Sequence, residues 1–148
     1  MTLRNCSTAL LLALALPAQT DVLRVGPVAP VAGKRGEAVT IKLDLKLANG
    51  FHLNSNKPDD PYLIPLRLTW DAAVDTVDVK FPEPKYERYA FSDKALSVFT
   101  GDFSVVSTVK PKNAGFMVLT GKLRYQACNH NACFPPKTID VKVPADIR

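Results

Sequence analysis

The sequence lacks a long apolar segment, a cluster of basic residues and, beyond about residue 20, any extended stretch with the 3.6-residue period of an amphipathic helix. Its longest unbroken apolar run, Ala9–Leu16, is far shorter than the roughly 20 residues that a membrane-spanning helix needs. The formal net charge is +5, but the lysines and arginines are scattered and no base-stacking aromatics accompany them. We therefore expect no stable membrane span and no nucleic-acid partner.

The first residues have the pattern of a secretory signal peptide. Arg4 supplies a positive charge, Ala9–Leu16 is apolar, and small residues follow. A short buried helix is the alternative interpretation. We expect cleavage to remove residues 1–20, Cys6 included, and to leave a periplasmic or secreted domain of residues 21–148. Such a domain is large enough to bury a core without a disulfide. It retains two cysteines in an oxidising compartment, where disulfides persist.

Alternation of apolar and polar residues is the strongest pattern in residues 21–148. In the first segment, Val39, Ile41 and Leu43 are apolar while Thr40 and Lys42 between them are polar, as in a strand with one buried face. The predicted strands lie within 37–47, 63–70, 74–81, 102–109, 116–125 and 139–143. The whole sequence has twelve prolines and seven glycines, which fits an all-β chain with many connections. The pattern predicts an all-β antiparallel sandwich.

Cys128 and Cys133 are the most concentrated chemistry in the sequence. They flank Asn129–Ala132 and would join the two arms of one hairpin at the end of a sheet. On the loop-entropy model, a closed loop of about six residues contributes only about 2 kcal/mol to stability. A domain of this size hardly needs that contribution, and this favours a bond that is made and broken.

Three interpretations of the pair remain open from the residues alone. It is a redox-active dithiol, a local structural disulfide, or a metal site formed by Cys128, His130 and Cys133. Zinc sites usually add a second pair of ligands, and the only other histidine is His52. Two thiolates can also bind copper(I), so the residues leave the metal interpretation open.

The segments around the cysteines resemble a known family. Tyr125–Cys128 followed by Cys133–Thr138 is similar to the active-site hairpin of the N-terminal periplasmic domain of the thiol:disulfide interchange protein DsbD. The segments 50–56, 62–65 and 91–93 resemble that family as well. The resemblance covers nearly all of residues 21–148, and the double proline after the second cysteine is its most specific part.

This resemblance implies an immunoglobulin-like β-sandwich that acts as a thiol:disulfide oxidoreductase. Cys128 and Cys133 would be the redox couple, with Cys133 forming the mixed disulfide and Cys128 resolving it. The partners would be a thioredoxin-like or membrane electron donor and periplasmic thiol proteins as acceptors, and no metal, nucleotide or flavin would be required. The alternative is a non-enzymatic module that binds another exported protein and keeps a structural disulfide.

The family also covers its cysteines with a loop that carries an aromatic ring. Phe91 is the best match for that ring, with an ordinary core residue as the alternative. His52 and Asn54 fall where the family places side chains that line the site, although both would also fit a surface loop. His130, if protonated near a sulfur, would lower the pKa of that thiol. Turn formation is the alternative role for His130 and its two asparagine neighbours.

Two features depart from the family pattern. The gap of four residues between the cysteines is shorter than in its best-known members. The sequence also contains no membrane electron-conducting domain, no Cys-x-x-Cys motif and no thioredoxin-like domain. We therefore expect the electron donor to be another polypeptide.

Overall fold

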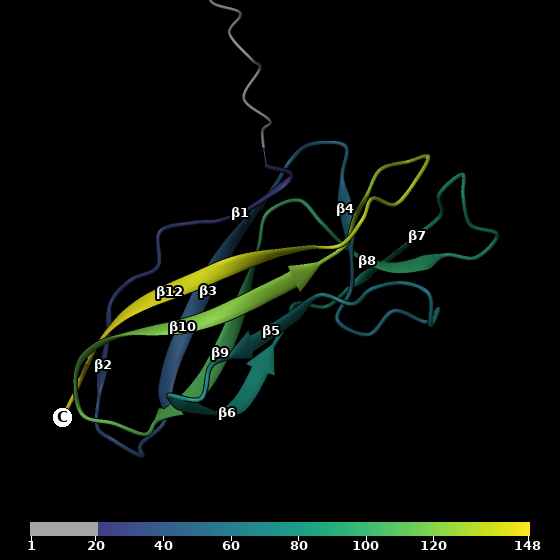
Figure 1. The fold of residues 1–148 in the computed structure, drawn as a ribbon. Helices are drawn as coiled ribbons and strands as arrows, with labels where there is room; N and C mark the ends of the chain where they lie inside the picture. The colour runs from purple at the N-terminus through teal and green to yellow at the C-terminus, as the bar shows by residue number, and fades with distance from the viewer. Residues whose placement is uncertain (1–20) are drawn as a thin grey trace, which may run out of the picture.

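The computed structural model describes residues 21–148, and all regular elements in this range are β-strands (Figure 1). The predicted signal peptide, residues 1–20, lies outside the described residues. None of the elements in 21–148 is a helix that is long and apolar enough to cross a membrane.

The strands form three four-stranded sheets. Sheet A has the order β1 (Leu23–Val25), β3 (Val39–Leu47), β9 (Phe103–Pro111), β6 (Val74–Lys80). Sheet B has the order β2 (Val31–Gly33), β12 (Lys137–Ile147), β10 (Gly115–Tyr125), β5 (Arg67–Trp70). Sheet C has the order β11 (Ala127–Cys128), β4 (His52–Asn54), β8 (Leu96–Thr100), β7 (Lys85–Glu87). All pairings are antiparallel except that of β12 with β2. The predicted all-β antiparallel sandwich is thus confirmed.

The core lies between sheets A and B and follows the predicted alternation. Every second residue of β3 is buried, Ile41 and Leu43 completely. Leu119 and Leu123 of β10 and Val143 of β12 are also completely buried. Burying a side chain of this size contributes roughly 1.5–3 kcal/mol, so these strands form the stable part of the fold.

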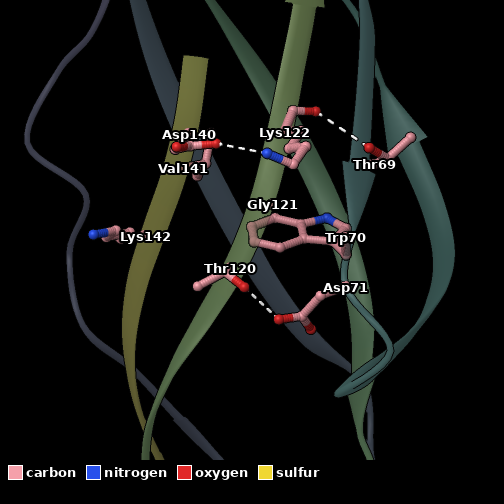
Figure 2. Close-up of a pocket in the computed structure, with 9 residues that line it drawn as sticks. All are labelled: Thr69, Trp70, Asp71, Thr120, Gly121, Lys122, Asp140, Val141 and Lys142. Atoms are coloured by element: carbon pink, nitrogen blue, oxygen red, sulfur yellow. Dashed lines mark hydrogen bonds and ion pairs between the residues drawn. The ribbon is translucent and has the colours of Figure 1, made fainter. Parts of the chain in front are cut away.

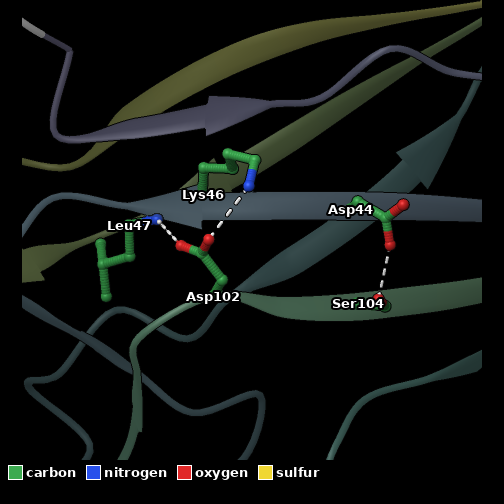
Figure 3. Close-up of polar contacts among 5 residues, drawn as sticks. All are labelled: Asp44, Lys46, Leu47, Asp102 and Ser104. Carbon is green, nitrogen blue, oxygen red and sulfur yellow. Dashed lines mark hydrogen bonds and ion pairs between the residues drawn. The ribbon is translucent and has the colours of Figure 1, made fainter.

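The solvent face of sheet A is polar (Figure 3). Lys46 Nζ donates to Asp102 at 3.1 Å, and the second carboxylate oxygen of Asp102 accepts from the Leu47 backbone N–H at 3.2 Å. The Lys46 hydrogen bond is the main reason why the pKa of Asp102 is lowered. Ser104 donates to Asp44 from β9 to β3 at 2.6 Å. These exposed pairs contribute little stability, and their role is to keep this face hydrophilic.

The structure differs from the predicted strands in two places. Only Arg67–Trp70 of the segment 63–70 forms a strand. Val77, predicted to be an inward-facing residue, is 54% exposed because β6 is irregular between Thr76 and Asp78. An extra residue in a strand interrupts the two-residue period and turns a side chain outward.

Sheet C lies at one end of the long strands (Figure 1). Its strand β11 contains Cys128, and Cys133 lies in the loop that follows this strand. The chain leaves sheet B at Tyr125, and after Gln126 it enters sheet C, where β11 pairs with β4. The loop that connects β11 to β12 projects there beside the loop that connects β7 to β8. The backbone N–H of Ala90 donates to the carbonyl of His130 at 3.1 Å and joins these two loops.

Candidate functional site

Cys128 and Cys133 form a disulfide that closes a tight loop. Their Cα atoms are 3.9 Å apart, and the two residues form an isolated antiparallel bridge. The loop is held by Asn129, whose side-chain oxygen accepts the backbone N–H groups of Asn131 and Ala132, each at 2.9 Å. Asn129 therefore forms the turn, which is the alternative role that the sequence suggested for it.

The two sulfur-bearing residues differ in exposure. Cys128 is completely buried, whereas Cys133 is only partly buried. Phe134, directly after Cys133, is 41% exposed, and its backbone N–H donates to the Ala127 carbonyl at 2.9 Å. An attacking thiolate must approach one sulfur in line with the disulfide, so this arrangement favours approach from the Cys133 side.

His52 lies directly opposite Cys128 in the pairing of β4 with β11. Directly opposite residues of an antiparallel pair point to the same face with Cβ atoms roughly 5 Å apart. The His52 side chain is 2% exposed, and its Nε2 atom has no hydrogen-bond partner. Burial lowers the pKa of His52 to about 4, although Glu87 acts in the opposite direction. The imidazole is therefore neutral at pH 7, and the surface-loop interpretation of His52 is wrong.

Asn54 is the second buried side chain on this face of β4. Its Nδ2 group donates to Gln126 Oε1 at 2.9 Å and to the Ile64 carbonyl at 3.1 Å. Gln126 Oε1 also accepts the Ile64 backbone N–H at 3.0 Å, and Gln126 Nε2 donates to the Phe134 carbonyl at 3.1 Å. The remaining atom of the Asn54 amide, Oδ1, lies 4.0 Å from Cys128 Sγ. Asn54 is completely buried, so a surface-loop role is wrong for this residue too.

The loop between β7 and β8 covers His52 with an aromatic ring that sequence reasoning missed. Tyr89 stacks on His52 with a centroid distance of 3.7 Å and an interplanar angle of 12°. Its hydroxyl donates to Glu87 at 2.7 Å, and burial together with this contact raises the pKa of Tyr89. Only its position two residues before Phe91 in the resembling segment could have indicated it.

Phe91 lies farther from the paired strands than Tyr89 does. Its ring centroid is 6.3 Å from that of His52 and 5.8 Å from that of Tyr89, and the three rings are nearly parallel. Phe91 is 36% exposed, so the alternative of an ordinary core residue is wrong. The structure thus brings Phe91 close to the site, and its role as a cover of the sulfurs stays a prediction.

His130 is exposed at the tip of the disulfide loop. Its ring approaches Tyr89 edge-on with a centroid distance of 6.4 Å. Within residues 21–148, no three His, Cys, Asp or Glu side chains are grouped so that they could hold a metal ion. His130 therefore belongs to the contact between the disulfide loop and the covering loop.

Two hollows on the surface differ in their relation to the disulfide. An apolar groove next to Cys133 is lined by Phe51, Phe134 and Pro135 among others, and the rings of Phe51 and Phe134 are 5.9 Å apart. The other hollow lies on sheet B around Trp70, away from these residues (Figure 2). Its polar side chains pair with one another: Thr120 donates to Asp71, and Lys122 contacts Asp140 at 3.0 Å. Both pairs are exposed and contribute little stability.

Comparison with known proteins identifies relatives of this architecture. The model of the family described as "Thiol:disulfide interchange protein DsbD, N-terminal" matches residues 19–145. The structure resembles the N-terminal periplasmic domain of ScsB from Proteus mirabilis, with a TM-score of 0.64 and 19% identity over 88% of this chain. The chain spans 49% of that ScsB chain.

A second solved structure is the reduced N-terminal domain of Neisseria meningitidis DsbD. It aligns with a TM-score of 0.52 and 16% identity over 80% of this chain and 85% of its own. No curated protein sequence matches the chain. At these identities the two solved structures establish the fold, which is the immunoglobulin-like β-sandwich that the sequence resemblance implied.

Proposed function

Because the chain belongs to the family of the N-terminal domain of the thiol:disulfide interchange protein DsbD, we propose that its Cys128–Cys133 pair, in the reduced dithiol form, exchanges with the disulfides of exported proteins. In this role it passes reducing equivalents to its partners in the periplasm or outside the cell. The observation that carries the proposal is a disulfide on a short loop at the end of the sandwich, with one buried and one partly exposed cysteine.

The exchange proceeds in two balanced steps. In the reduced domain, the Cys133 thiolate attacks a partner disulfide, forms a mixed disulfide and releases one partner thiolate, which takes up a proton. The Cys128 sulfur then loses its proton and attacks Cys133 Sγ. This second step releases the other partner thiolate and restores the Cys128–Cys133 disulfide. Two electrons and two protons pass to the partner, and a thioredoxin-like or membrane dithiol donor returns them to the domain.

The difference in burial supports the assignment of roles to the two cysteines. A protein partner must reach the sulfur that it bonds to, and Cys133 is the less buried of the two. The resolving cysteine needs to reach only its neighbour, whose Cα atom is 3.9 Å away in the closed form. We therefore assign the mixed disulfide to Cys133 and resolution to Cys128.

The loop that carries Tyr89 and Phe91 serves as a cover in this proposal. Aromatic rings over the site slow the reaction of the sulfurs with small thiols and disulfides, and they swing aside for the correct partner. His52 and Asn54 line the buried side of the site, and His130 anchors the covering loop through its backbone carbonyl. The chemistry of thiol exchange needs no metal, nucleotide or flavin.

A trapping experiment with oxidised glutathione tests the roles of the cysteines. The protein for this experiment is prepared with the substitution Cys6→Ser, so that the third cysteine of the sequence forms no adduct. Reduced Cys128→Ser should accumulate a glutathione adduct on Cys133, detected by mass spectrometry, while the matched Cys133→Ser variant should form far less. Equal adducts on both variants, or none on either, would refute the assignment.

The complete burial of Cys128 favours one competing function, a protein-binding module with a structural disulfide. The reduction potential of the Cys128–Cys133 pair discriminates between the two. A potential in the range of glutathione or thioredoxin couples supports exchange, whereas a value well below about −300 mV indicates a structural bond.

A further inference from the structure

The hydrogen bonds of Asn54 fix which end of its amide faces the disulfide. Both bonds of the Nδ2 group go to acceptors, Gln126 Oε1 and the Ile64 carbonyl. Gln126 is oriented in turn, because its Oε1 also accepts from the Ile64 N–H and its Nε2 donates to the Phe134 carbonyl. Reversing either amide would set donor against donor or acceptor against acceptor. Asn54 Oδ1 is therefore held toward Cys128 Sγ, 4.0 Å away.

In the disulfide form this oxygen faces a sulfur that carries no hydrogen. Reduction by a dithiol adds two electrons and two protons to the pair, breaks the S–S bond and leaves one proton on each sulfur. Cys128 then becomes a donor beside a fixed acceptor. A thiolate in the same place would instead face the lone pairs of the carbonyl oxygen, and hydrogen bonding to the neutral form disfavours ionisation.

We propose that Asn54, oriented by Gln126 and Ile64, is a positioning residue that accepts the thiol hydrogen of reduced Cys128 and so keeps this sulfur protonated while Cys133 ionises first. The consequence for exchange rests on the proposed function. The hydrogen bond itself is a property of the reduced domain alone and is measured without any partner.

Among the described residues, no buried positive charge lies beside Cys128 that would stabilise a thiolate. On β4, His52 is neutral at pH 7 because burial lowers its pKa to about 4. Glu87, at the end of β7, accepts the hydroxyl hydrogen of Tyr89, which stacks on His52. His130 lies exposed in the disulfide loop. The residues of β8 opposite His52 and Asn54 are Thr100 and Val98, which carry no charge.

The hydrogen bonds of Gln126 also link the surroundings of the two cysteines. Gln126 bonds at one end to Asn54, which faces Cys128, and at the other to the carbonyl of Phe134, the residue after Cys133. The same set of amides thus orients the acceptor for one sulfur and holds the backbone next to the other. The different roles of the two sulfurs, mixed-disulfide formation at Cys133 and resolution at Cys128, then follow from hydrogen bonding as well as from burial.

Infrared spectroscopy of the reduced chain tests the proposal directly. The protein is prepared with the substitution Cys6→Ser, reduced with dithiothreitol and then separated from the reagent. We expect a thiol S–H stretching band at the lowered frequency of a hydrogen-bonded thiol. This band should disappear in Cys128→Ser and remain in Cys133→Ser. A Cys128 band at the frequency of an unbonded thiol overturns the proposal with no Asn54 variant needed.

The pH dependence of alkylation tests the effect on ionisation. The rate of iodoacetamide labelling is measured for each cysteine, on its own peptide, as a function of pH. The midpoint of this pH profile reports ionisation of the thiol, whereas the limiting rate at high pH reports access to the sulfur. Asn54→Ala should lower the midpoint of Cys128 by about one pH unit, a tenfold gain in its thiolate fraction at pH 7. The exposed Asn131→Ala is the matched control and should leave the midpoint unchanged. An unchanged or raised midpoint in Asn54→Ala contradicts the proposal.

A second variant covers the case in which Asn54→Ala does not fold. Gln126→Met removes the side-chain acceptor that orients the Asn54 amide and should lower the Cys128 midpoint in the same direction, by less. An unchanged midpoint there contradicts the role of Gln126. If the infrared band and midpoints are as expected but Cys128→Ser traps no glutathione, the proposed function fails and this inference stands. If Cys128→Ser does trap glutathione but the Cys128 thiol is not hydrogen-bonded, this inference fails and the proposed function stands.

Discussion

Replacing His52 with phenylalanine should make the domain less sensitive to acid. His52 is buried under Tyr89 opposite Cys128, and its pKa is lowered to about 4. In the unfolded chain a histidine has its ordinary pKa of about 6.5. Below pH 6.5 the unfolded chain therefore binds a proton that the folded chain does not bind until about pH 4. The His52 contribution to stability is fully present above pH 6.5 and is lost as the pH falls toward 4.

The two pKa values set the size of the effect. Between pH 7.5 and pH 5 the linkage relation gives a loss of about 2 kcal/mol in the free energy of unfolding, and about 3 kcal/mol by pH 4. Phenylalanine can stack on Tyr89 as the imidazole does and does not titrate. His52→Phe should therefore lose about 2 kcal/mol less than the wild type between pH 7.5 and pH 5.

Urea unfolding of the oxidised protein at the two pH values measures this difference. The fluorescence of Trp70, the one tryptophan of the sequence, reports the transition. His130→Phe is the matched control, because it removes the other histidine, which is exposed, and should follow the wild-type profile. Equal losses in wild type and His52→Phe would refute the reasoning, since they would mean that burial does not keep His52 neutral.

Three further predictions follow from the packing and the disulfide. Gly121→Ala should lower the free energy of unfolding by about 1–3 kcal/mol and shift Trp70 emission, because its Cβ would meet the Trp70 ring at 2.9 Å; unchanged urea midpoints and emission would contradict this. Reducing the disulfide should lower stability by only about 2 kcal/mol, as its loop is short, and leave a folded domain; unfolding on reduction, followed by circular dichroism, would show that the bond is essential. Phe91→Ala and Tyr89→Ala should each speed alkylation of the reduced pair, Tyr89→Ala more; unchanged rates would mean that neither ring covers it.

The sequence predicted the long strands well because each buries one face. The alternation in β3 and β10 appears directly as alternating burial. The short strands were not predicted, because three residues cannot establish a period. β8 failed for another reason: its first four residues, Leu96–Phe99, are all buried, so no alternation exists to find. Segments covered on both faces lose the two-residue signal.

The site was predicted in part. The disulfide followed from the resemblance and from the spacing of the cysteines. The burial of His52 and Asn54 could not be predicted, because it depends on β4 pairing with β11 and β8 and on the loop that folds over it. Gln126 carried no signal of its own, since its role arises only when three distant segments meet.

The uneven lengths of the strands imply that the domain contains two units of different local stability. β10 and β12 pair over eleven residues each, whereas the strand that carries Cys128 has two residues and pairs with a strand of three. Short ladders open at a lower free-energy cost than long ones, so sheet C should open while sheets A and B stay intact. Amide hydrogen exchange should therefore be fast at β11 and β4 and slow at β10 and β12. Local unfolding of this kind would expose Cys128 without loss of the sandwich.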